Sequence, residues 1–328
     1  MAVFNTSNYV HKMIEDIIQQ SYKNFKLFAV DDGSADGSMD ILRDFENKDA
    51  RVIAISKTNG GPGSARNVAL DYIKENDLVF DYIWFCDSDD RVEKNALKKT
   101  IEAMERTKSD YGLMSVCRFD KKTKSIYRSH IKKETEMSHK DIVCQYFRYG
   151  KKWKKEPCSE AFLNNKIFKF DIVKNIRFRT DISRAEDFDY FFRVLPKIRK
   201  GILVPDCYYY YRLRKSSLTN SYKKTGDLEV CSSHYYKLSD RTIEEQISIQ
   251  HKLIRAYYLE ICQAYNSKDN AKYKKLINDI SNINFKYPYL LGDRKIIFLL
   301  KYSKTMLPTF INFRNKTIRT RDTRHFYE

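Results

Sequence analysis

The chain has 328 residues, of which 42% are hydrophobic and 32% are charged, so it can form one large domain with a decoration, or two domains, around a sizeable core. No apolar run approaches the ~20 residues of a membrane span and no N-terminal signal peptide is recognisable, so we expect a cytoplasmic protein. Seven scattered cysteines without a Cys-x-x-Cys pair argue against a disulfide framework or a zinc site. The net charge of +18 favours anionic partners, namely nucleic acid, acidic membrane or phosphorylated substrates.

The N-terminal part of the chain predicts a parallel α/β unit. Met1 to Phe4 form a short strand, and apolar residues at helical spacing predict an amphipathic helix over Val10 to Ile18. Buried strands are predicted at Phe25 to Val30 and at Val52 to Ile55. Strand, helix and strand in this order open an α/β sheet, and such sheets bind ligands at the carboxyl ends of their strands.

Two carboxylates, Asp31 and Asp32, directly follow the second strand and stand beside a glycine turn. A carboxylate at this edge of a sheet can accept hydrogen bonds from a base N–H group or from ribose hydroxyls. The alternative is a structural role at the start of the next helix, for which Asp36 and Ser38 are N-cap candidates.

A glycine-rich segment, Asn59 to Asn67, follows the third strand and leads into a predicted helix. Glycines allow the backbone to approach a ligand closely, and a helix N-terminus favours phosphate. The segment lacks the Gly-Lys-Ser/Thr end of a P-loop. Alone, a loop of this kind is more often a simple turn.

The stretch from Ile83 to Asp90 runs from four apolar residues into three carboxylates. The apolar run predicts a buried parallel strand, which places Asp87, Asp89 and Asp90 at its carboxyl end. Three acids within four residues repel one another and need a positive partner. A divalent cation that also contacts phosphate would supply it, because Mg²⁺ and Mn²⁺ prefer oxygen ligands. A solvated turn is the alternative.

The middle of the chain predicts a charged helix with an apolar stripe over Val92 to Arg106 and a strand over Asp110 to Phe119. A basic hairpin or loop from Lys121 to His139 and a short helix from Asp141 to Tyr149 follow. The four lysines within Lys151 to Lys155 suit contact with an acceptor or a lipid phosphate, or form a solvated loop.

A second acidic group, Glu186 and Asp187, begins a predicted helix with inward-facing aromatic residues. The helix dipole favours ionised carboxylates in the first turn. An ionised carboxylate in a cleft can remove a proton from a hydroxyl group. A pure capping role is the alternative for Asp187.

The C-terminal part changes in character. Gly201 to Tyr211 read as a strand that ends at Arg212, and residues 227–282 predict Tyr- and Lys-rich amphipathic helices. Beyond them, short apolar patches between residues 296 and 313 are flanked by cations. This pattern suits an interfacial segment on anionic lipid, and a helical cap or a dimer interface is the alternative.

Four motifs in this order resemble GT-A family 2 glycosyltransferases over roughly residues 1–219: Val3-Phe4-Asn5, Asp31-Asp32-Gly33-Ser34, Asp87-Ser88-Asp89 and Glu186-Asp187, with the segment GPGSARN after the second. The resemblance implies an α/β fold of the GT-A (Rossmann-like) type, with a mixed, mostly parallel sheet flanked by helices. Residues 1–219 would form the catalytic domain, and residues 220–328 a helical, basic C-terminal region.

Two departures from the family pattern affect what we expect. Family members have a full hydrophobic strand before the first motif, whereas Met1 stands only three residues before Phe4. Either this strand is cut short or the true start lies upstream. Because the strand is central in the sheet, its loss would lower stability and disturb the nucleotide pocket. Ala185 replaces the usual glycine before the last motif and restricts the backbone there.

The resemblance further implies an inverting glycosyltransferase that uses a nucleotide-sugar, with a UDP-sugar as the expected donor. Asp187 would be the base that deprotonates the acceptor hydroxyl, and Asp89 would bind Mn²⁺ or Mg²⁺ that bridges the diphosphate. Arg66 would lie near the donor phosphates, with a surface salt bridge as the alternative. The full set expected to bind the nucleotide-sugar is Phe4, Asn5, Asp31, Asp32, Arg66, Asp87, Ser88, Glu186 and Arg212.

The expected setting is bacterial cell-surface polysaccharide synthesis, with a glycan or lipid-linked acceptor at the inner face of the cell membrane. The alternative is a non-catalytic nucleotide-sugar-binding or membrane-associated scaffold protein of the same fold. The positive charge alone would also suit a nucleic-acid binder, but no RRM, KH, helix-turn-helix or finger pattern occurs. We therefore expect no nucleic-acid partner.

Overall fold

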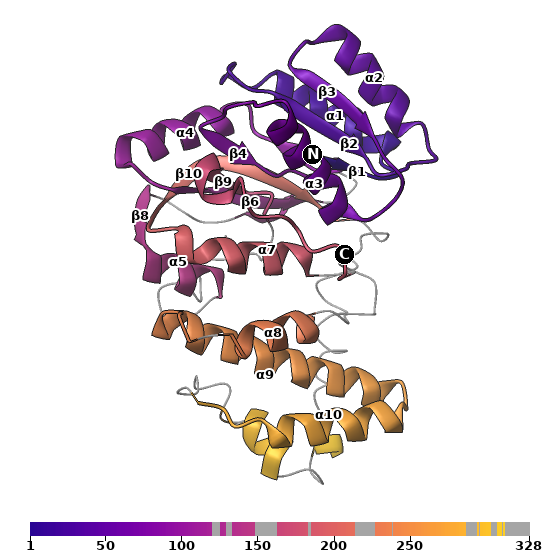
Figure 1. The fold of residues 1–328 in the computed structure, drawn as a ribbon, viewed down its shortest axis with the longest axis vertical. Helices are drawn as coiled ribbons and strands as arrows, with labels where there is room; N and C mark the ends of the chain where they lie inside the picture. Colours follow the sequence, from indigo (N-terminus) through magenta and orange to yellow (C-terminus); the bar gives the residue numbers. More distant parts are fainter. Residues whose placement is uncertain are drawn as a thin grey trace. The chain divides into compact units, whose positions relative to one another are not determined.

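The computed structural model describes residues 1–119, 125–128, 133–147, 163–182, 185–213, 227–237, 239–286, 294, 296–302, 307–309 and 311. The chain divides into two compact units, Met1–Tyr222 and Lys223–Glu328 (Figure 1). The expected domain boundary near residue 219 falls in the stretch 214–226, which lies outside the described residues.

The first unit opens with alternating strands and helices. They are β1 (Ala2–Val3), α1 (Ser7–Ile18), β2 (Leu27–Asp31), α2 (Ser38–Lys48), β3 (Val52–Ser56), α3 (Pro62–Glu75) and β4 (Tyr82–Trp84). β1, β2 and β3 pair in parallel. An isolated parallel bridge joins Ala2 to Asp87, just beyond β4. β1 therefore lies between β2 and β4. The strand order reverses at β1, and open α/β sheets bind ligands at such a reversal.

The remaining strands of the first unit form a mixed sheet in the order β4-β9-β6-β10-β5, with β7 on β6 and β8 on β10. β6 and β10 pair in parallel, and the other pairs are antiparallel. The mixed α/β fold expected from the sequence is confirmed. The further elements are β5 (Arg91–Val92), α4 (Ala96–Thr107), β6 (Tyr111–Phe119), β7 (Ser125–Arg128), β8 (Thr135–Ser138), α5 (His139–Tyr146), β9 (Lys166–Lys169), α6 (Phe170–Val173), α7 (Glu186–Val194), η1 (Leu195–Lys197) and β10 (Lys200–Arg212).

A bulge in β10 positions the aromatic run that follows it. Val204 pairs with Met114, but the next residue of β6, Ser115, pairs with Tyr208. Asp206 within the bulge has a positive φ of 52°. Bulges re-aim side chains and are common beside functional sites. Here the bulge lets Tyr209 return to the sheet with its side chain fully buried.

Helices cover the sheet as their apolar stripes predict. The residues of α1 expected to face the core, among them Met13 and Ile14, are fully buried, as is Met104 of α4. They belong to one hydrophobic cluster with residues of α2 and of both sheets. Through α1 and α2 the chain moves across the sheet from β1 to β2 and on to β3. Through α3 it moves in the opposite direction, from β3 back to β4. Right-handed crossovers therefore place α3 on the other face of the sheet.

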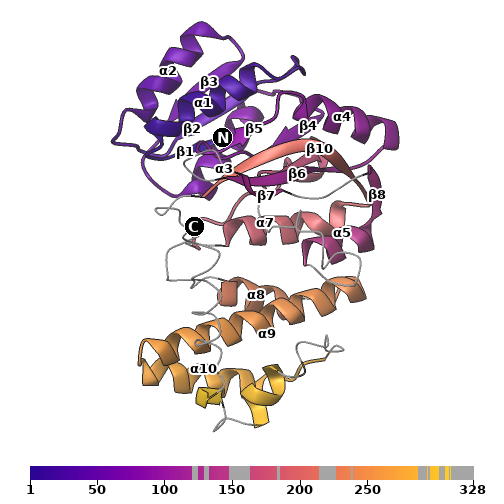
Figure 2. The same cartoon turned by 180° about the vertical axis from the view of Figure 1, so that it is seen from behind.

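The second unit is helical, as predicted, with α8 (Asp227–Tyr235), α9 (Ile243–Asn266), α10 (Asn270–Asn282) and η3 (Phe298–Tyr302). α9 and α10 lie side by side (Figure 2). α9 begins with a capping box between Thr242 and Glu245. In the parts of the chain that the structure describes, no helix has both the length and the apolar character needed to cross a bilayer. The basic residues from Arg314 onward lie outside the described residues.

Candidate active site

Three carboxylates from distant parts of the chain meet at one arginine. Arg66, on α3, donates from Nη1 to Asp187 Oδ1 at 2.6 Å and to Glu186 Oε1 at 3.4 Å. Its Nη2 donates to Asp87 Oδ1 at 2.9 Å. The Arg66 side chain is only 5% exposed, whereas that of Asp87 is 32% exposed. The sequence placed Arg66 near donor phosphates, with a surface salt bridge as the alternative. In the structure it is a buried ion-pair centre.

Close packing of α3 against the start of α7 makes this meeting possible. A Cβ atom at Gly63 would lie 3.1 Å from the Cβ of Phe178 and 3.5 Å from the Cγ of Glu186. A larger residue at Gly63 would therefore push the two segments apart. The Arg66 guanidinium also lies 5.2 Å from the centroid of the Phe178 ring, which stacks on Tyr190 of α7.

Asp187 combines a partly desolvated carboxylate with an available oxygen. Burial raises the pKa of Asp187 to about 7; the Arg66 cation opposes this rise, and the charges of Glu186 and Asp87 add to it. Oδ1 accepts from Arg66, and within the described part of the chain Oδ2 accepts no hydrogen bond. A carboxylate with a pKa near neutrality and an available oxygen suits proton abstraction.

In the turn after β4, side chains of Asp87 and Ser88 bond to groups from two other segments. Asp87 Oδ2 accepts from Asn164 Nδ2 at 3.2 Å. Ser88 Oγ lies 2.9 Å from Thr6 Oγ1, so the buried serine hydroxyl ties this turn to the end of β1. Asp89, the next residue of the turn, is partly exposed. The structure thus brings Asp87, Ser88 and Asp89 to the point where β1 and β4 meet.

Asp90 is an anchor of this turn that the sequence analysis did not assign to the site. It is fully buried, and burial raises its pKa well above the ordinary value. Its Oδ2 accepts from the Tyr209 hydroxyl at 2.7 Å, and its Oδ1 accepts from the backbone N–H of Arg212 at 2.7 Å. The Tyr209 hydroxyl also accepts from the N–H of Asp87 at 3.3 Å. The only available signal was its place as the third acid of the run, because Tyr209 is far away in sequence.

Arg212 lies beside the same turn. Its Nε donates to the carbonyl of Asp89 at 2.7 Å. Its guanidinium lies 4.8 Å from the Tyr9 ring and 4.5 Å from the Phe119 ring. The side chain therefore stacks between aromatic residues and supports the turn. The lysine group 151–155 lies outside the described residues.

The two acids after β2 differ sharply in their partners. Asp32 accepts from Lys57 Nζ at 2.6 Å and from the N–H groups of Gly60 at 2.9 Å and Gly61 at 2.7 Å. Its carboxylate therefore fastens the glycine-rich loop. Asp31 accepts from the N–H of Ser34 through Oδ2, but its buried Oδ1 has no hydrogen-bond partner within the described residues. A buried carboxylate oxygen without a partner suits an incoming N–H or O–H donor.

The remaining residues expected at the nucleotide-sugar site lie on the segment after β1. Phe4 is 49% exposed and can offer its ring as a flat apolar surface. Asn5 has a positive φ of 48° and accepts from the N–H of Ala35 through Oδ1 at 2.9 Å. Its own N–H donates to Ser34 Oγ at 2.9 Å. Phe4 and Asn5 thus flank the same edge as Asp31.

The residues present fit a hard divalent cation that draws most of its ligands from a substrate. Within the described residues, no group of three His, Cys, Asp or Glu side chains is arranged to hold a metal by itself. Asp89 is partly exposed and stands two residues after Asp87 in the same turn. One or two carboxylates together with substrate phosphates is a usual arrangement for Mg²⁺.

Ala185, which stands before α7, adopts a backbone conformation that favours glycine, with φ 61° and ψ 22°. We predict that Ala185→Gly stabilises the protein by about 0.5–1 kcal/mol, because an L-residue there costs about 1–2 kcal/mol and glycine recovers part of it. Urea unfolding measures this. The control Ala69→Gly, within α3, should destabilise by about 1 kcal/mol. A loss of stability in both variants would contradict the prediction.

Comparison with known proteins shows the family of the chain. The family model "Glycosyl transferase family 2" matches residues 1–177. Glycosyltransferase GlyA of Streptococcus pneumoniae is 25% identical over 85% of the chain and 41% of its own length. The minor teichoic acid biosynthesis protein GgaB of Bacillus subtilis is 26% identical over 66% of the chain and 23% of its own length. The chain thus spans less than half of either relative.

A solved structure shows the same fold. The structure of Staphylococcus aureus TarS 1-349 in complex with UDP-GlcNAc has a TM-score of 0.67 to this chain at 18% identity. The match covers 100% of this chain and 91% of that one. Since the family model covers more than half of the residues, the chain belongs to glycosyl transferase family 2.

Proposed function

We propose that the protein is an inverting glycosyltransferase that moves a sugar from a UDP-sugar to a hydroxyl of a glycan or lipid-linked acceptor in bacterial cell-surface polysaccharide synthesis. The observation that carries this proposal is the single guanidinium of Arg66, which holds Asp87 and Asp187 within one site. Asp87 belongs to the expected donor side of the site, and Asp187 belongs to the expected acceptor side. Residues 1–222 are the proposed catalytic domain.

The donor's nucleotide is proposed to lie at the ends of β1 and β2. The unpartnered Asp31 Oδ1 would accept from a uracil N–H, and the exposed Phe4 ring would contact the base. Asp32 would act indirectly, because it already fastens the glycine-rich loop. The choice of uridine is supported by the similar fold of TarS, whose structure contains UDP-GlcNAc.

The diphosphate is proposed to lie against the turn after β4. Asp89 would hold Mn²⁺ or Mg²⁺ there, and the cation would neutralise charge on the departing UDP. Asp87 is kept in place by Arg66 and Asn164 and can contact the ribose or the hydration shell of the cation. Ser88 and Arg212 fix the backbone of the turn through Thr6 and the Asp89 carbonyl.

The chemical step is proposed to use Asp187 as the base. Asp187 Oδ2 takes the proton of the acceptor hydroxyl while the acceptor oxygen forms a bond to the anomeric carbon. The bond from that carbon to the diphosphate oxygen breaks, and UDP leaves from the opposite face, so the anomeric configuration inverts. Glu186 shares Arg66 with the base and adds negative charge beside it. That charge helps to raise the pKa of Asp187.

Asp89→Asn should abolish metal-dependent donor binding, because the amide oxygen carries no charge to hold a divalent cation. Calorimetric titration with UDP in the presence and absence of Mn²⁺ measures this loss. Asp44→Asn is the matched control, since Asp44 is exposed on α2, where it pairs with Lys48. Unchanged Mn²⁺-dependent UDP binding in Asp89→Asn would refute the assignment of Asp89.

The transfer rate should depend on pH through Asp187. Its pKa is raised to about 7, and the base works only when ionised. We therefore expect kcat/KM to fall about tenfold per pH unit below pH 7 and to level off above it. The profile is measured at saturating metal. A rate that stays flat from pH 5.5 to pH 8 would contradict the assignment of Asp187.

A lipid-linked acceptor would place the enzyme on the inner face of the membrane. The net charge of +18 supports attraction to anionic lipid. Phe298, in the second unit, is 58% exposed and could insert into an interface. We propose peripheral membrane association on these grounds.

A further inference from the structure

Asn67 is the last residue of the glycine-rich segment, and the proposed reaction gives it no role. It lies on α3, directly after Arg66, and its side chain binds both backbone groups of Phe178. Nδ2 donates to the Phe178 carbonyl at 2.9 Å, and Oδ1 accepts from the Phe178 N–H at 2.7 Å. Phe178 is buried and lies outside the helices and strands of the first unit. Because an amide side chain is both donor and acceptor, Asn67 supplies the partners that a neighbouring strand would otherwise give.

The segment 177–179 lies between one face of α3 and one face of α7. Gly63, Asn67 and Asp71 follow one another at intervals of four residues, so they share a face of α3. Gly63 leaves room for the segment, since a Cβ atom there would lie 3.3 Å from the carbonyl oxygen of its last residue. Asp71 Oδ1 accepts from Arg177 Nε at 2.8 Å. Asn67 therefore holds the segment at the middle of this face.

The other side of the segment is fixed to α7. The Phe178 ring stacks on the Tyr190 ring, with the centroids 3.9 Å apart and the planes at 7°. Arg193 Nη2 donates to the Arg177 carbonyl at 2.8 Å. Tyr190 stands three residues after Asp187, which is about one helical turn. The segment therefore holds α7 close to the proposed base.

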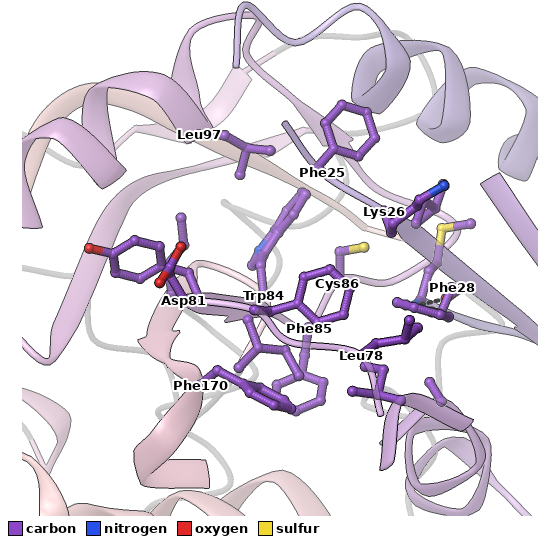
Figure 3. A pocket seen from close by; sticks show the side chains of 18 of the residues that line it. Phe25, Lys26, Phe28, Leu78, Asp81, Trp84, Phe85, Cys86, Leu97 and Phe170 are labelled. Atoms are coloured by element: carbon purple, nitrogen blue, oxygen red, sulfur yellow. Dashed lines mark hydrogen bonds between the residues drawn. The ribbon is translucent and has the colours of Figure 1, made fainter. Parts of the chain in front are cut away.

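The same aromatic pair reaches the turn that carries Asp87. Phe85, two residues before Asp87, meets the rings of Phe178 and Tyr190 edge to face, with centroids 5.2 Å and 5.4 Å away. Phe85 also lines a mostly apolar cavity of about 450 Å³ (Figure 3). Phe178 therefore contacts all three parts of the chain that meet at Arg66, namely α3, α7 and the end of β4.

We propose that Asn67 is a positioning residue for sugar transfer, which locks Phe178 between α3 and α7 and thereby holds Asp187 at Arg66. This role rests on the proposed function, in which Asp187 is the base. Asn67 acts through the backbone of Phe178 and not by contact with the reacting atoms. A displacement of about 1 Å at a reacting group can cost about 10²-fold in rate, so a hydrogen-bonded lock behind the base matters for catalysis.

Asn67→Ala should lower kcat about 10–100-fold and change UDP affinity by less than about twofold. Donor binding should persist because Asp87 is also held by Asn164. Asn67→Gln keeps both the donor and the acceptor and should lose less activity than Asn67→Ala. Asn76→Ala is the matched control, since Asn76 Nδ2 donates to the Tyr72 carbonyl at the exposed end of α3. Full activity of Asn67→Ala would overturn the proposal.

The pH profile separates a lock behind the base from a general loss of stability. The charges around Asp187 are those of Arg66, Glu186, Asp87 and Lys166, and Arg66 lowers the pKa of Asp187 most. A looser contact with Arg66 therefore raises that pKa and leaves more of the base protonated. The loss of kcat/KM in Asn67→Ala should be larger at pH 6 than at pH 8.5. An equal loss at both pH values would overturn the proposal.

Melting temperatures test the same lock without turnover. Arg66→Met should lower the melting temperature by about 10 °C in the original protein, and by about half as much in an Asn67→Ala background. The two changes are not additive because Asn67→Ala has already weakened the pair that Arg66 forms with Asp187. An Asn76→Ala background should keep the full effect. Equal effects in all three backgrounds would overturn the proposal. Absence of turnover in every protein would refute the proposed function, and the melting temperatures would still decide whether Asn67 holds the pair together.

Discussion

Asp187→Asn should lower the rate of sugar transfer about 10²–10⁴-fold and leave donor binding nearly unchanged. Positioned general bases contribute about this factor. The asparagine side chain has the same shape, and its amide oxygen can still accept from Arg66 Nη1, so the arrangement around Arg66 should persist. Initial rates of UDP release and calorimetric UDP affinity together separate catalysis from binding.

The matched control for this prediction is Asp171→Asn, which makes the same chemical change at a side chain that is 83% exposed on α6. It should keep full activity. Transfer at the normal rate by Asp187→Asn would show that another group removes the proton. A parallel loss of UDP affinity would show that Asp187 belongs to the donor site instead.

Arg66→Met should destabilise the protein by about 3 kcal/mol, which is a fall in melting temperature on the order of 10 °C. The substitution keeps much of the apolar stem and removes the cation that pairs with both Asp187 and Asp87. The two partly buried carboxylates then lose the positive charge that offsets their own. Removing one partner of a buried ion pair lowers the free energy of unfolding strongly. Without the cation, the pKa of Asp187 should rise further above 7, since Arg66 is the group that lowers it most.

Arg106→Met is the control, because Arg106 forms an exposed ion pair with Glu134. Exposed pairs contribute about 0–1 kcal/mol, so this variant should melt within a few degrees of the original protein. Arg66→Lys should fall between the two, because a lysine cannot offer a fork of donors to several carboxylates at once. Equal melting temperatures for Arg66→Met and Arg106→Met would contradict the ion-pair role.

Local pattern was enough to predict much of the fold. The apolar run before Asp87 and the glycine-rich segment before α3 are local signals, and a strand and a helix form where they indicate. The prediction of a buried parallel strand was wrong in detail, because β4 is half-buried and its ladder with β9 is antiparallel. The helical face of α1 also follows from spacing alone. In the second unit, amphipathic spacing predicts helices over 227–282, and α8, α9 and α10 occupy most of this range.

Two central contacts of the site could not be predicted, because they join residues more than 100 positions apart. Arg66 and Asp187 are 121 positions apart, and Asp90 and Tyr209 are 119 apart. Sequence pattern named Arg66 and Asp187 as candidates but gave no sign that they form an ion pair. Tyr209 was one of several tyrosines in a row, and only the bulge in β10 selects it.

Asp31 and Asp32 show a second limit of prediction from the sequence. Adjacent acids at the end of a strand point to opposite sides, so they have different surroundings. The sequence offers both as nucleotide ligands, whereas the structure surrounds Asp32 with N–H donors and leaves Asp31 Oδ1 without one. Only the fold of the glycine-rich loop decides between them.

The most direct measurement of the central claim is UDP release from a panel of UDP-sugars, with Mn²⁺ or Mg²⁺ present and with water or a glycan as acceptor. We predict that at least one UDP-sugar is turned over in a metal-dependent way, and that Asp187→Asn reduces the release at least 100-fold. Metal-dependent UDP binding without release from any UDP-sugar would contradict the account and would indicate a nucleotide-sugar-binding protein that does not catalyse transfer.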